Sequence, residues 1–157
     1  TSSDVLDTTL AVQMAGACDL LLAGVDEVRT AAAEQARAHK FTPMMGRSHG
    51  IHAEPVTFGL KMALMHDEFG RVRERLVQVR ERVAVGKLSG AVGTRAHLDP
   101  QVEEDVCRSL GLRPATLSTQ IVQRDRHAEF VTVLALAASS IDRWATEFRH
   151  LQRTEVC

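Results

Sequence analysis

Two regular apolar seams constrain the fold of this chain more than any other feature of its sequence. In each seam the apolar residues recur at alternating steps of four and three, an average of about 3.5 residues, which is the repeat of a coiled coil. Such a repeat keeps one face of a helix against its neighbour and predicts a left-handed supercoil. One seam comprises Phe58, Met62, Met65, Phe69, Val72, Leu76, Val79 and Val83, and the other comprises Phe130, Leu134, Ala137, Ile141, Trp144, Phe148 and Leu151.

Two further segments carry helical patterns. A similar period, slightly longer, runs through the first segment at Leu10, Met14, Ala17, Leu21, Val25, Val28 and Ala32. A short helix is expected to begin near Asp99 and Pro100, since Asp caps a helix and Pro fits its first turn, and to end near Gly111.

Helix length predicts the architecture. A helix from Glu54 to about Gly86 has roughly 30 residues and spans on the order of 45 Å. A compact domain of this size has a radius of gyration of only about 15 Å. We therefore predict an all-α fold, an elongated bundle of long antiparallel helices formed by residues 1–157 as one domain. Such a bundle exposes an apolar face for other chains, so oligomerisation is expected.

Composition excludes several classes of function. The net charge of -1 gives no support for a nucleic-acid partner or an anionic membrane surface. No apolar run approaches the length needed to cross a bilayer, and nothing resembles a signal peptide. The three cysteines are scattered, which fits free thiols in a reducing cytoplasm.

Both ends of the sequence favour a longer parent chain. The sequence opens on Thr1-Ser2-Ser3-Asp4 without an initiating Met, and the last helical pattern reaches Cys157 with no Gly, Asn or Pro to stop it. We therefore expect this domain to be truncated at both ends.

The segment from Gly46 to Pro55 is the strongest candidate for chemistry. It reads Gly-Arg-Ser-His-Gly-Ile-His-Ala-Glu-Pro, a glycine-flanked loop before a long helix, with imidazoles at His49 and His52. Glycine lets the backbone approach a ligand closely, and histidine titrates near neutral pH. The segment is typical of a catalytic loop with a proton-transfer group. Two alternatives remain open, a structural histidine and a metal pair at His49 and His52, although no Cys or His cluster supplies the third protein ligand that zinc requires.

Three more polar segments lie between the helical patterns. Thr1–Asp4 offers hydroxyls and N–H groups at a helix start, which suits a carboxylate or phosphate but also an ordinary N-cap. Residues 118–127 concentrate amides, cations and a histidine before the last helix, and the alternative is a solvated loop in which Arg124, Asp125 and Arg126 pair among themselves or with other chains. Residues 86–94 are glycine-rich without a phosphate-loop pattern, so we interpret them as a turn where backbones pack closely.

Together these segments resemble the adenylosuccinate lyases of the fumarase/aspartase superfamily. The resemblance spans essentially the whole sequence in the right order. It is most specific in His-Gly-Ile-His-Ala-Glu-Pro from His49, in Ser-Thr-Gln from Ser118 and in Gln-Arg-Asp-Arg-His from Gln123. It implies the central helical domain of a cytoplasmic enzyme without cofactor or metal, in a homotetramer whose active sites are shared between subunits. The implied reaction releases fumarate from adenylosuccinate, giving AMP, and from the succinyl-carboxamide ribotide (SAICAR) of purine synthesis.

The resemblance also implies roles for individual residues. His49 would be the general acid that protonates the departing nitrogen, with His52 supporting the loop. Thr1 and Ser2 would bind substrate, and Gln120 would hydrogen-bond its succinyl portion. Ser48 stands where the family more often has threonine. The family's base is a serine in a Gly-Ser-Ser-x-Met-Pro loop, which does not occur in residues 1–157, so we expect this polypeptide alone to be inactive.

Three alternatives are kept. The first is another superfamily lyase that releases fumarate from a different amine, and the second is a related cycloisomerase. The third is a non-catalytic helical module that uses the seams only for association, which leaves the polar loops unexplained.

Overall fold

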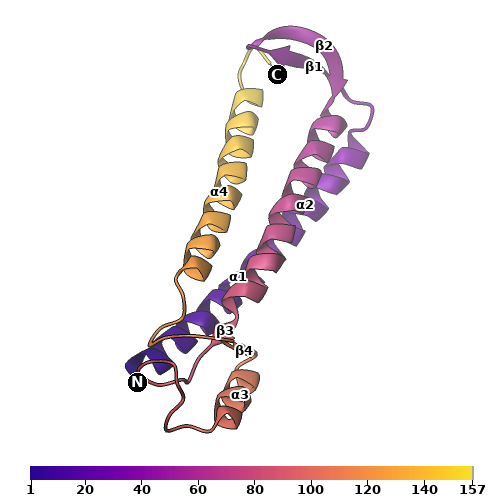
Figure 1. Ribbon diagram of the computed structural model, residues 1–157. Helices are drawn as coiled ribbons and strands as arrows, with labels where there is room; N and C mark the ends of the chain where they lie inside the picture. The colour runs from indigo at the N-terminus through magenta and orange to yellow at the C-terminus, as the bar shows by residue number, and fades with distance from the viewer. Residues whose placement is uncertain (157) are drawn as a thin grey trace. The chain divides into compact units, whose positions relative to one another are not determined.

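A computed structural model describes residues 1–156, and helices dominate them (Figure 1). The four helices in this range are α1 (Ser2–Ala38), α2 (Phe58–Val83), α3 (Pro100–Ser109) and α4 (Asp125–Leu151). Two short sheets accompany them, formed by β1 (Pro43–Ser48) with β2 (Ile51–Thr57) and by β3 (Val85–Gly86) with β4 (Arg113–Pro114). The predicted all-α class is confirmed.

The short helix lies where the sequence predicts it. Asp99 caps α3 by accepting a hydrogen bond from the Gln101 N–H at 2.9 Å, and Pro100 occupies the first turn. Gly111, with a φ of 70°, follows the end of the helix. Its position just past the helix fits the preference for glycine where the backbone becomes left-handed.

Two predicted helix boundaries are wrong. The second helix begins at Phe58 rather than Glu54, because Glu54 and its neighbours form a strand, and Thr57 accepts a hydrogen bond from the Leu60 N–H at 3.2 Å as an N-cap. The last helix ends at Leu151 rather than continuing, and turn hydrogen bonds such as Val156 N–H to the Arg153 carbonyl follow it.

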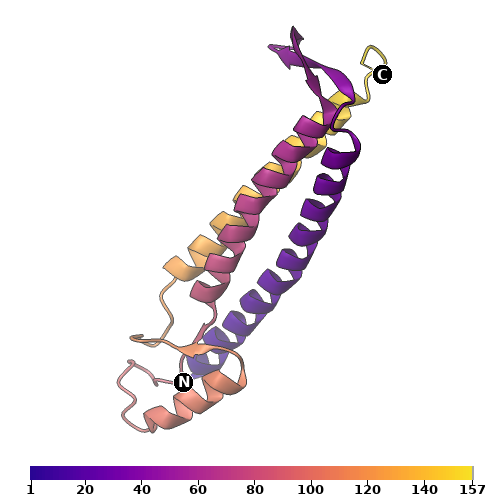
Figure 2. The same cartoon turned by 90° about the vertical axis from the view of Figure 1, so that its right-hand side faces the viewer.

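The chain divides into two compact units, which we describe separately. The first unit contains residues 1–22 and 75–135. Its α3 lies beside the start of α1 (Figure 2), and β3 pairs with β4 in parallel. Small residues allow close packing in its core, which includes Ala11, Ala15, Ala84, Cys107 and Leu112.

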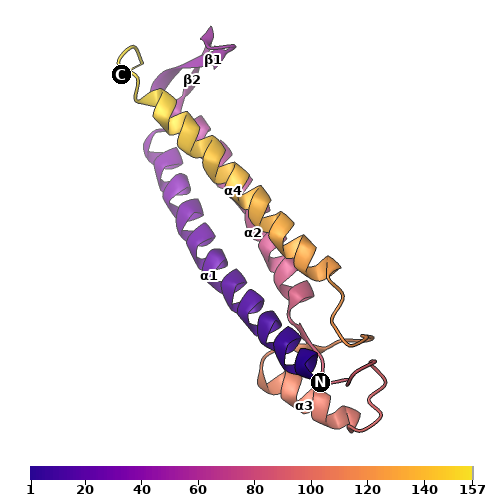
Figure 3. The same ribbon diagram turned by 90° about the vertical axis from the view of Figure 1, so that its left-hand side faces the viewer.

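The second unit contains residues 23–74 together with the chain from Leu136. Here the β1–β2 hairpin joins α1 to α2, and the C-terminal half of α4 packs along α2 (Figure 3). Antiparallel packing of α2 and α4 is fixed by Glu68, which accepts hydrogen bonds from Arg143 and from the Trp144 indole at 3.0 Å. His66 joins α2 to α1, since its Nδ1 lies 2.9 Å from the Arg29 carbonyl.

The burial of side chains agrees with the predicted seams to a different extent on each long helix. The α2 seam is confirmed, because six of its positions are buried: Met62, Phe69, Val72, Leu76, Val79 and Val83. On α4 the prediction holds for Trp144 but is wrong for Ile141, which is 57% exposed. On α1 the seam is confirmed at Met14, Val25 and Ala32, which are buried, and is wrong at Leu10 and Leu21, which are exposed. Ala11, Ala15 and Cys18, which the predicted seam does not include, are also buried.

One helix in the described residues is long and apolar enough to cross a membrane by length and composition alone. An 18-residue window of α1 has a mean hydropathy of 1.4, so the expectation that no apolar run approaches this length is wrong for Ser2–Ala38. One third of the window (33%) is buried within the chain, and a core helix passes the same test. The helix therefore carries no membrane assignment by itself.

Candidate functional site

The segment that contains both candidate histidines is a β-hairpin, not the irregular loop that the sequence predicts. Strands β1 and β2 pair antiparallel, with Ser48 opposite Ile51 and Arg47 opposite His52. The two residues of the turn, His49 and Gly50, have φ values of 55° and 78°. Positive φ at both positions is the signature of the tightest hairpin turns, where Asn-Gly is the usual sequence. His49 occupies the turn position where asparagine is usual, so the sequence does not show the Asn-Gly pattern that would predict a hairpin.

Strain and close packing define the hairpin. A positive φ is uncommon for a residue with a side chain, and such residues gather at functional sites. A Cβ on Gly46 would lie 2.4 Å from the Glu54 carbonyl oxygen, so only glycine fits at the irregularity in β1. The Arg47 guanidinium donates to the Gly50 carbonyl at 3.0 Å and braces the turn. The hairpin therefore presents His49 at its tip on a braced backbone.

The two histidines have different surroundings. The exposed His49 imidazole makes no hydrogen bond with any residue from 1 to 156. His52 lines a hollow of about 640 Å³ between the hairpin and the end of α4, in the same unit. Polar side chains of this hollow include Arg47, Lys61, Glu147, His150 and Arg153. The geometry leaves His49 free to meet a partner group and gives His52 a place in the wall of a pocket.

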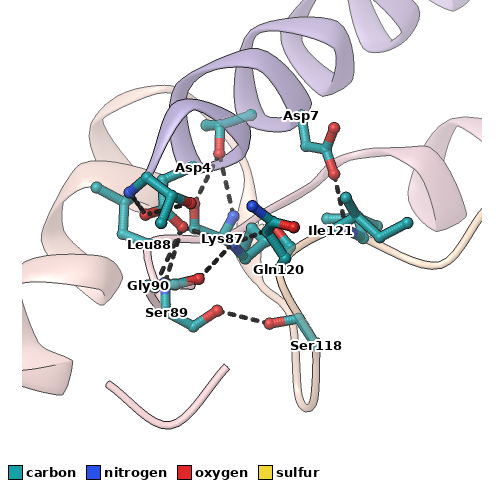
Figure 4. Close-up of polar contacts among 12 residues, drawn as sticks. Asp4, Asp7, Lys87, Leu88, Ser89, Gly90, Ser118, Gln120 and Ile121 are labelled. Atoms are coloured by element: carbon teal, nitrogen blue, oxygen red, sulfur yellow. Dashed lines mark hydrogen bonds and ion pairs between the residues drawn. The ribbon is translucent and has the colours of Figure 1, made fainter. Parts of the chain in front are cut away.

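The other predicted site residues lie in the first unit. Thr1 and Ser2 are exposed at the start of α1, and Gln120 is exposed in the segment before α4. A buried polar network joins these two segments (Figure 4). Its centre is Lys87, whose Nζ lies 2.5 Å from Asp4 Oδ1 and 2.8 Å from the Gln120 carbonyl oxygen. The structure thus brings the start of α1 and the Gln120 backbone together, while His49 belongs to the second unit.

Asp4 is ionised throughout the physiological range. Burial alone raises the pKa of its carboxyl, but hydrogen bonds, foremost the one from Lys87, outweigh that effect and lower the pKa to about 2. The same carboxylate accepts from the Ser89 and Gly90 N–H groups at 3.2 and 3.3 Å. A paired, hydrogen-bonded charge of this kind is stable in a buried position.

The glycine-rich segment packs as predicted. A Cβ on Gly93 would lie 2.1 Å from the Ser118 carbonyl oxygen, so the two backbones touch. Close by, the hydroxyls of Ser89 and Ser118 are 2.7 Å apart. Opposite Asp4, the buried carboxylate of Glu103 accepts from the Leu88 N–H at 2.9 Å and pairs with Arg95. Two buried carboxylates thus hold this loop.

Sequence reasoning missed several members of the network. Asp7 accepts from the Val122 N–H at 2.7 Å and from Arg124 at 2.9 Å, and Arg126 donates to the Arg82 carbonyl at 2.7 Å. Arg124 and Arg126 thus contact other segments of this chain, and in residues 1–156 they do not pair with Asp125, as one form of the solvated-loop alternative has it. Aspartates three apart in the first turns of a helix were the available signal, but the positions of their partners depend on the fold.

No group of three or more His, Cys, Asp or Glu side chains in residues 1–156 is arranged to hold a metal ion. The predicted site residues themselves supply the hydroxyls of Thr1 and Ser2, the amide of Gln120 and the imidazole of His49. These groups can orient carboxylates and transfer a proton, which are the requirements of an elimination next to a carboxylate.

Comparison with known proteins assigns the family. The sequence model of a protein family described as "Lyase" matches residues 1–157, the whole sequence. The chain belongs to this lyase family.

Curated relatives of this lyase chain include adenylosuccinate lyases from several bacteria. The adenylosuccinate lyase of Synechocystis sp. is 56% identical over 156 residues, which are 99% of this chain and 36% of the relative. The adenylosuccinate lyase of Bacillus subtilis is 52% identical over 155 residues, with the same coverage of 99% and 36%. The chain thus spans little more than a third of the length of the curated relatives it matches.

Solved structures of similar proteins show the same fold. A fumarate lyase from Mesorhizobium sp. has a TM-score of 0.92 and 37% identity, over 99% of this lyase chain and 37% of the other. A 3-carboxy-cis,cis-muconate lactonizing enzyme from Pseudomonas putida has a TM-score of 0.90 and 34% identity, over 99% of this chain and 36% of that enzyme. Proteins named as a lyase and as a lactonizing enzyme therefore share this fold, so the fold alone does not determine the reaction.

Proposed function

We propose that this chain is the central part of an adenylosuccinate lyase, which releases fumarate from adenylosuccinate to give AMP, and from SAICAR. The observation that carries the proposal is the 56% identity to an adenylosuccinate lyase over 99% of the chain. The lactonizing enzyme among the structural neighbours is less similar, at 34% identity. The proposal includes a cytoplasmic location and no cofactor.

The reaction requires three kinds of group. A base removes a proton from the carbon next to a carboxylate, and the electron pair left on that carbon spreads onto the carboxylate. Preorganised donors stabilise this charge. The C–N bond then breaks, the electrons stay on nitrogen, and an acid protonates it.

The described residues supply the donors and the acid. In our proposal His49 protonates the departing nitrogen, a role that fits an exposed imidazole on a braced hairpin tip with no internal partner. Thr1 and Ser2 bind substrate at the start of α1, where N–H groups and hydroxyls favour an anion. Gln120 hydrogen-bonds the succinyl portion from its exposed position.

The base lies outside residues 1–157 in this proposal. Since no Gly-Ser-Ser-x-Met-Pro segment occurs in the sequence, the 157-residue polypeptide is expected to release no fumarate by itself. A longer chain that contains it should be active.

We further propose a homotetramer with active sites shared between subunits. The support is the exposure of large apolar side chains on the long helices, such as Leu20 at 78%, Leu60 at 62% and Val131 at 61%. Packing of these helices against other subunits would remove such side chains from water. Light scattering of the full-length enzyme after size exclusion should give the mass of four chains, and a monomer would contradict the proposal.

An activity assay tests the function itself. The full-length enzyme should convert adenylosuccinate to AMP and fumarate, followed by the change in ultraviolet absorbance when the purine amine is freed. Turnover of a carboxy-muconate but not of adenylosuccinate would favour the cycloisomerase. Turnover of neither would favour an association module or a lyase acting on a different amine.

A further inference from the structure

Lys87 is completely buried, and all of its donors are used. None of its surface is exposed, and its Nζ reaches Asp4 Oδ1 at 2.5 Å, the Gln120 carbonyl at 2.8 Å and the Gly90 carbonyl at 3.3 Å (Figure 4). An ammonium group has three N–H donors, so three acceptors saturate it. Lys87 therefore has no donor for a ligand, and any effect on substrate must pass through its neighbours.

The three acceptors belong to three separate segments. Asp4 lies in the first turn of α1, Gly90 in the glycine-rich loop, and Gln120 in the polar segment before α4. The backbone of Lys87 is itself fixed, because its N–H donates to Thr8 Oγ1 at 3.1 Å and its carbonyl accepts from the same hydroxyl at 3.0 Å. Lys87 thus cross-links the unit at one rigid point.

This cross-link holds the backbone of Gln120 while its side chain remains exposed. The Gln120 carbonyl is bound by Lys87, and two residues later the Val122 N–H is bound by the buried carboxylate of Asp7 at 2.7 Å. Anchors this close together leave the intervening backbone little freedom. A side-chain amide on a fixed backbone is preorganised, so less ordering entropy is lost when it binds a ligand.

We propose that Lys87 is a positioning residue whose buried ammonium fixes the Gln120 main chain and so directs the Gln120 amide toward the succinyl portion of the substrate. This inference rests on the proposed function, in which Gln120 binds that portion. A misplacement of about 1 Å in a positioning group can lower the rate about 100-fold, so the effect should be large enough to measure.

A double-mutant cycle separates positioning from general support of the fold. If Lys87 acts through Gln120, its replacement has little left to affect once the Gln120 amide is gone. If Lys87 only stabilises the unit, its replacement lowers activity by the same factor whether Gln120 is present or not.

The cycle uses the full-length enzyme and adenylosuccinate. Lys87→Met should lower kcat/KM about 10- to 100-fold in the wild-type background and less than about twofold in the Gln120→Ala background. Equal losses in the two backgrounds would overturn the proposal. The control is Glu68→Gln, which removes one charge of a partly buried ion pair in the other unit. It should lower kcat/KM by the same factor in the wild-type and Gln120→Ala backgrounds.

Hydrogen exchange supplies a readout that does not need activity. In Lys87→Met the peptide spanning residues 118–124 should exchange faster than in the wild type, and in Glu68→Gln it should not. Unchanged exchange in Lys87→Met would overturn the proposal. If wild-type enzyme does not act on adenylosuccinate, the proposed function fails, whereas exchange still decides whether Lys87 holds this segment.

A second variant covers the case in which Lys87→Met does not fold. Asp4→Asn with Lys87→Met removes both charges, so neither is left buried without its partner. The double variant is then tested in the wild-type and Gln120→Ala backgrounds and by hydrogen exchange of residues 118–124. The results that support or overturn the proposal are the same as for Lys87→Met.

Discussion

Asp7 and Arg124 form an ion pair 2.9 Å long between α1 and the segment before α4. The Asp7 carboxylate is only 6% exposed, and its second oxygen accepts from the buried Val122 N–H at 2.7 Å. One carboxylate thus satisfies a guanidinium and a backbone donor 117 and 115 residues away in sequence. This contact fixes the path of the chain just after Gln120.

Replacing Asp7 by Ala should destabilise the fold. The Val122 N–H would be left buried without an acceptor, which costs about 1–3 kcal/mol of unfolding free energy. Urea unfolding of the full-length enzyme measures the change. Asp19→Ala is the control, because Asp19 also pairs with an arginine, Arg80, but lies at the surface and satisfies no buried donor, so its effect should be clearly smaller. Equal losses of unfolding free energy in Asp7→Ala and Asp19→Ala would show that the hydrogen bond from the Val122 N–H adds no stability.

Helix positions could be predicted from the sequence because they depend on local rules. The seam on α2 and the Asp99 cap of α3 both follow from residue spacing within one segment. The hairpin was missed because His49 occupies a turn position that usually carries Asn, so no turn signal was visible. The seam on α1 is only partly right, because Met14, Val25 and Ala32 are buried as predicted whereas Ala11 and Ala15 are buried in place of the leucines.

The candidate site could be predicted only in part, for a similar reason. Thr1, Ser2, His49 and Gln120 stand in recognisable motifs, and the structure shows all four exposed. Their roles remain predictions. Lys87 carries no sequence signal for its role, because two of its three acceptors lie 83 and 33 residues away along the chain. Contacts at such separations depend on the whole fold, which local patterns do not encode.

Gly46 should tolerate no side chain. Because a Cβ would lie 2.4 Å from the Glu54 carbonyl, Gly46→Ala must shift one strand of the hairpin and move His49. We expect kcat to fall by about 10-fold or more, since misplacing a catalytic group by about 1 Å has an effect of this size. Gly24→Ala is the matched control in the same unit. A Cβ there meets nothing within 4 Å, and alanine should stabilise α1 by about 0.5–1 kcal/mol without loss of activity. Full activity in Gly46→Ala would contradict the strained-hairpin interpretation.

The Asp4–Lys87 pair predicts a specific acid sensitivity. The pKa of Asp4 is lowered from 3.8 to about 2, so the folded state favours its ionised form. The resulting stabilisation, roughly 2 kcal/mol, is fully present above pH 4 and is lost as the pH falls from about 4 to about 2. Asp4→Asn should therefore be less stable than the wild type at pH 6, and the difference should shrink toward pH 2.5. Urea midpoints at several pH values measure it, and a constant difference would rule out this titration as the cause.

The two histidines of the hairpin should respond differently to replacement. If His49 protonates the departing nitrogen, His49→Ala in the full-length enzyme should lower kcat by about 100- to 10,000-fold with little change in stability, because its exposed imidazole has no internal partner. His52→Ala, the matched control across the turn, removes part of a pocket wall and should retain most of the activity. Steady-state kinetics with adenylosuccinate and a thermal unfolding curve for each variant decide the question. The reverse pattern would assign the proton donor to His52, the imidazole that lines the hollow.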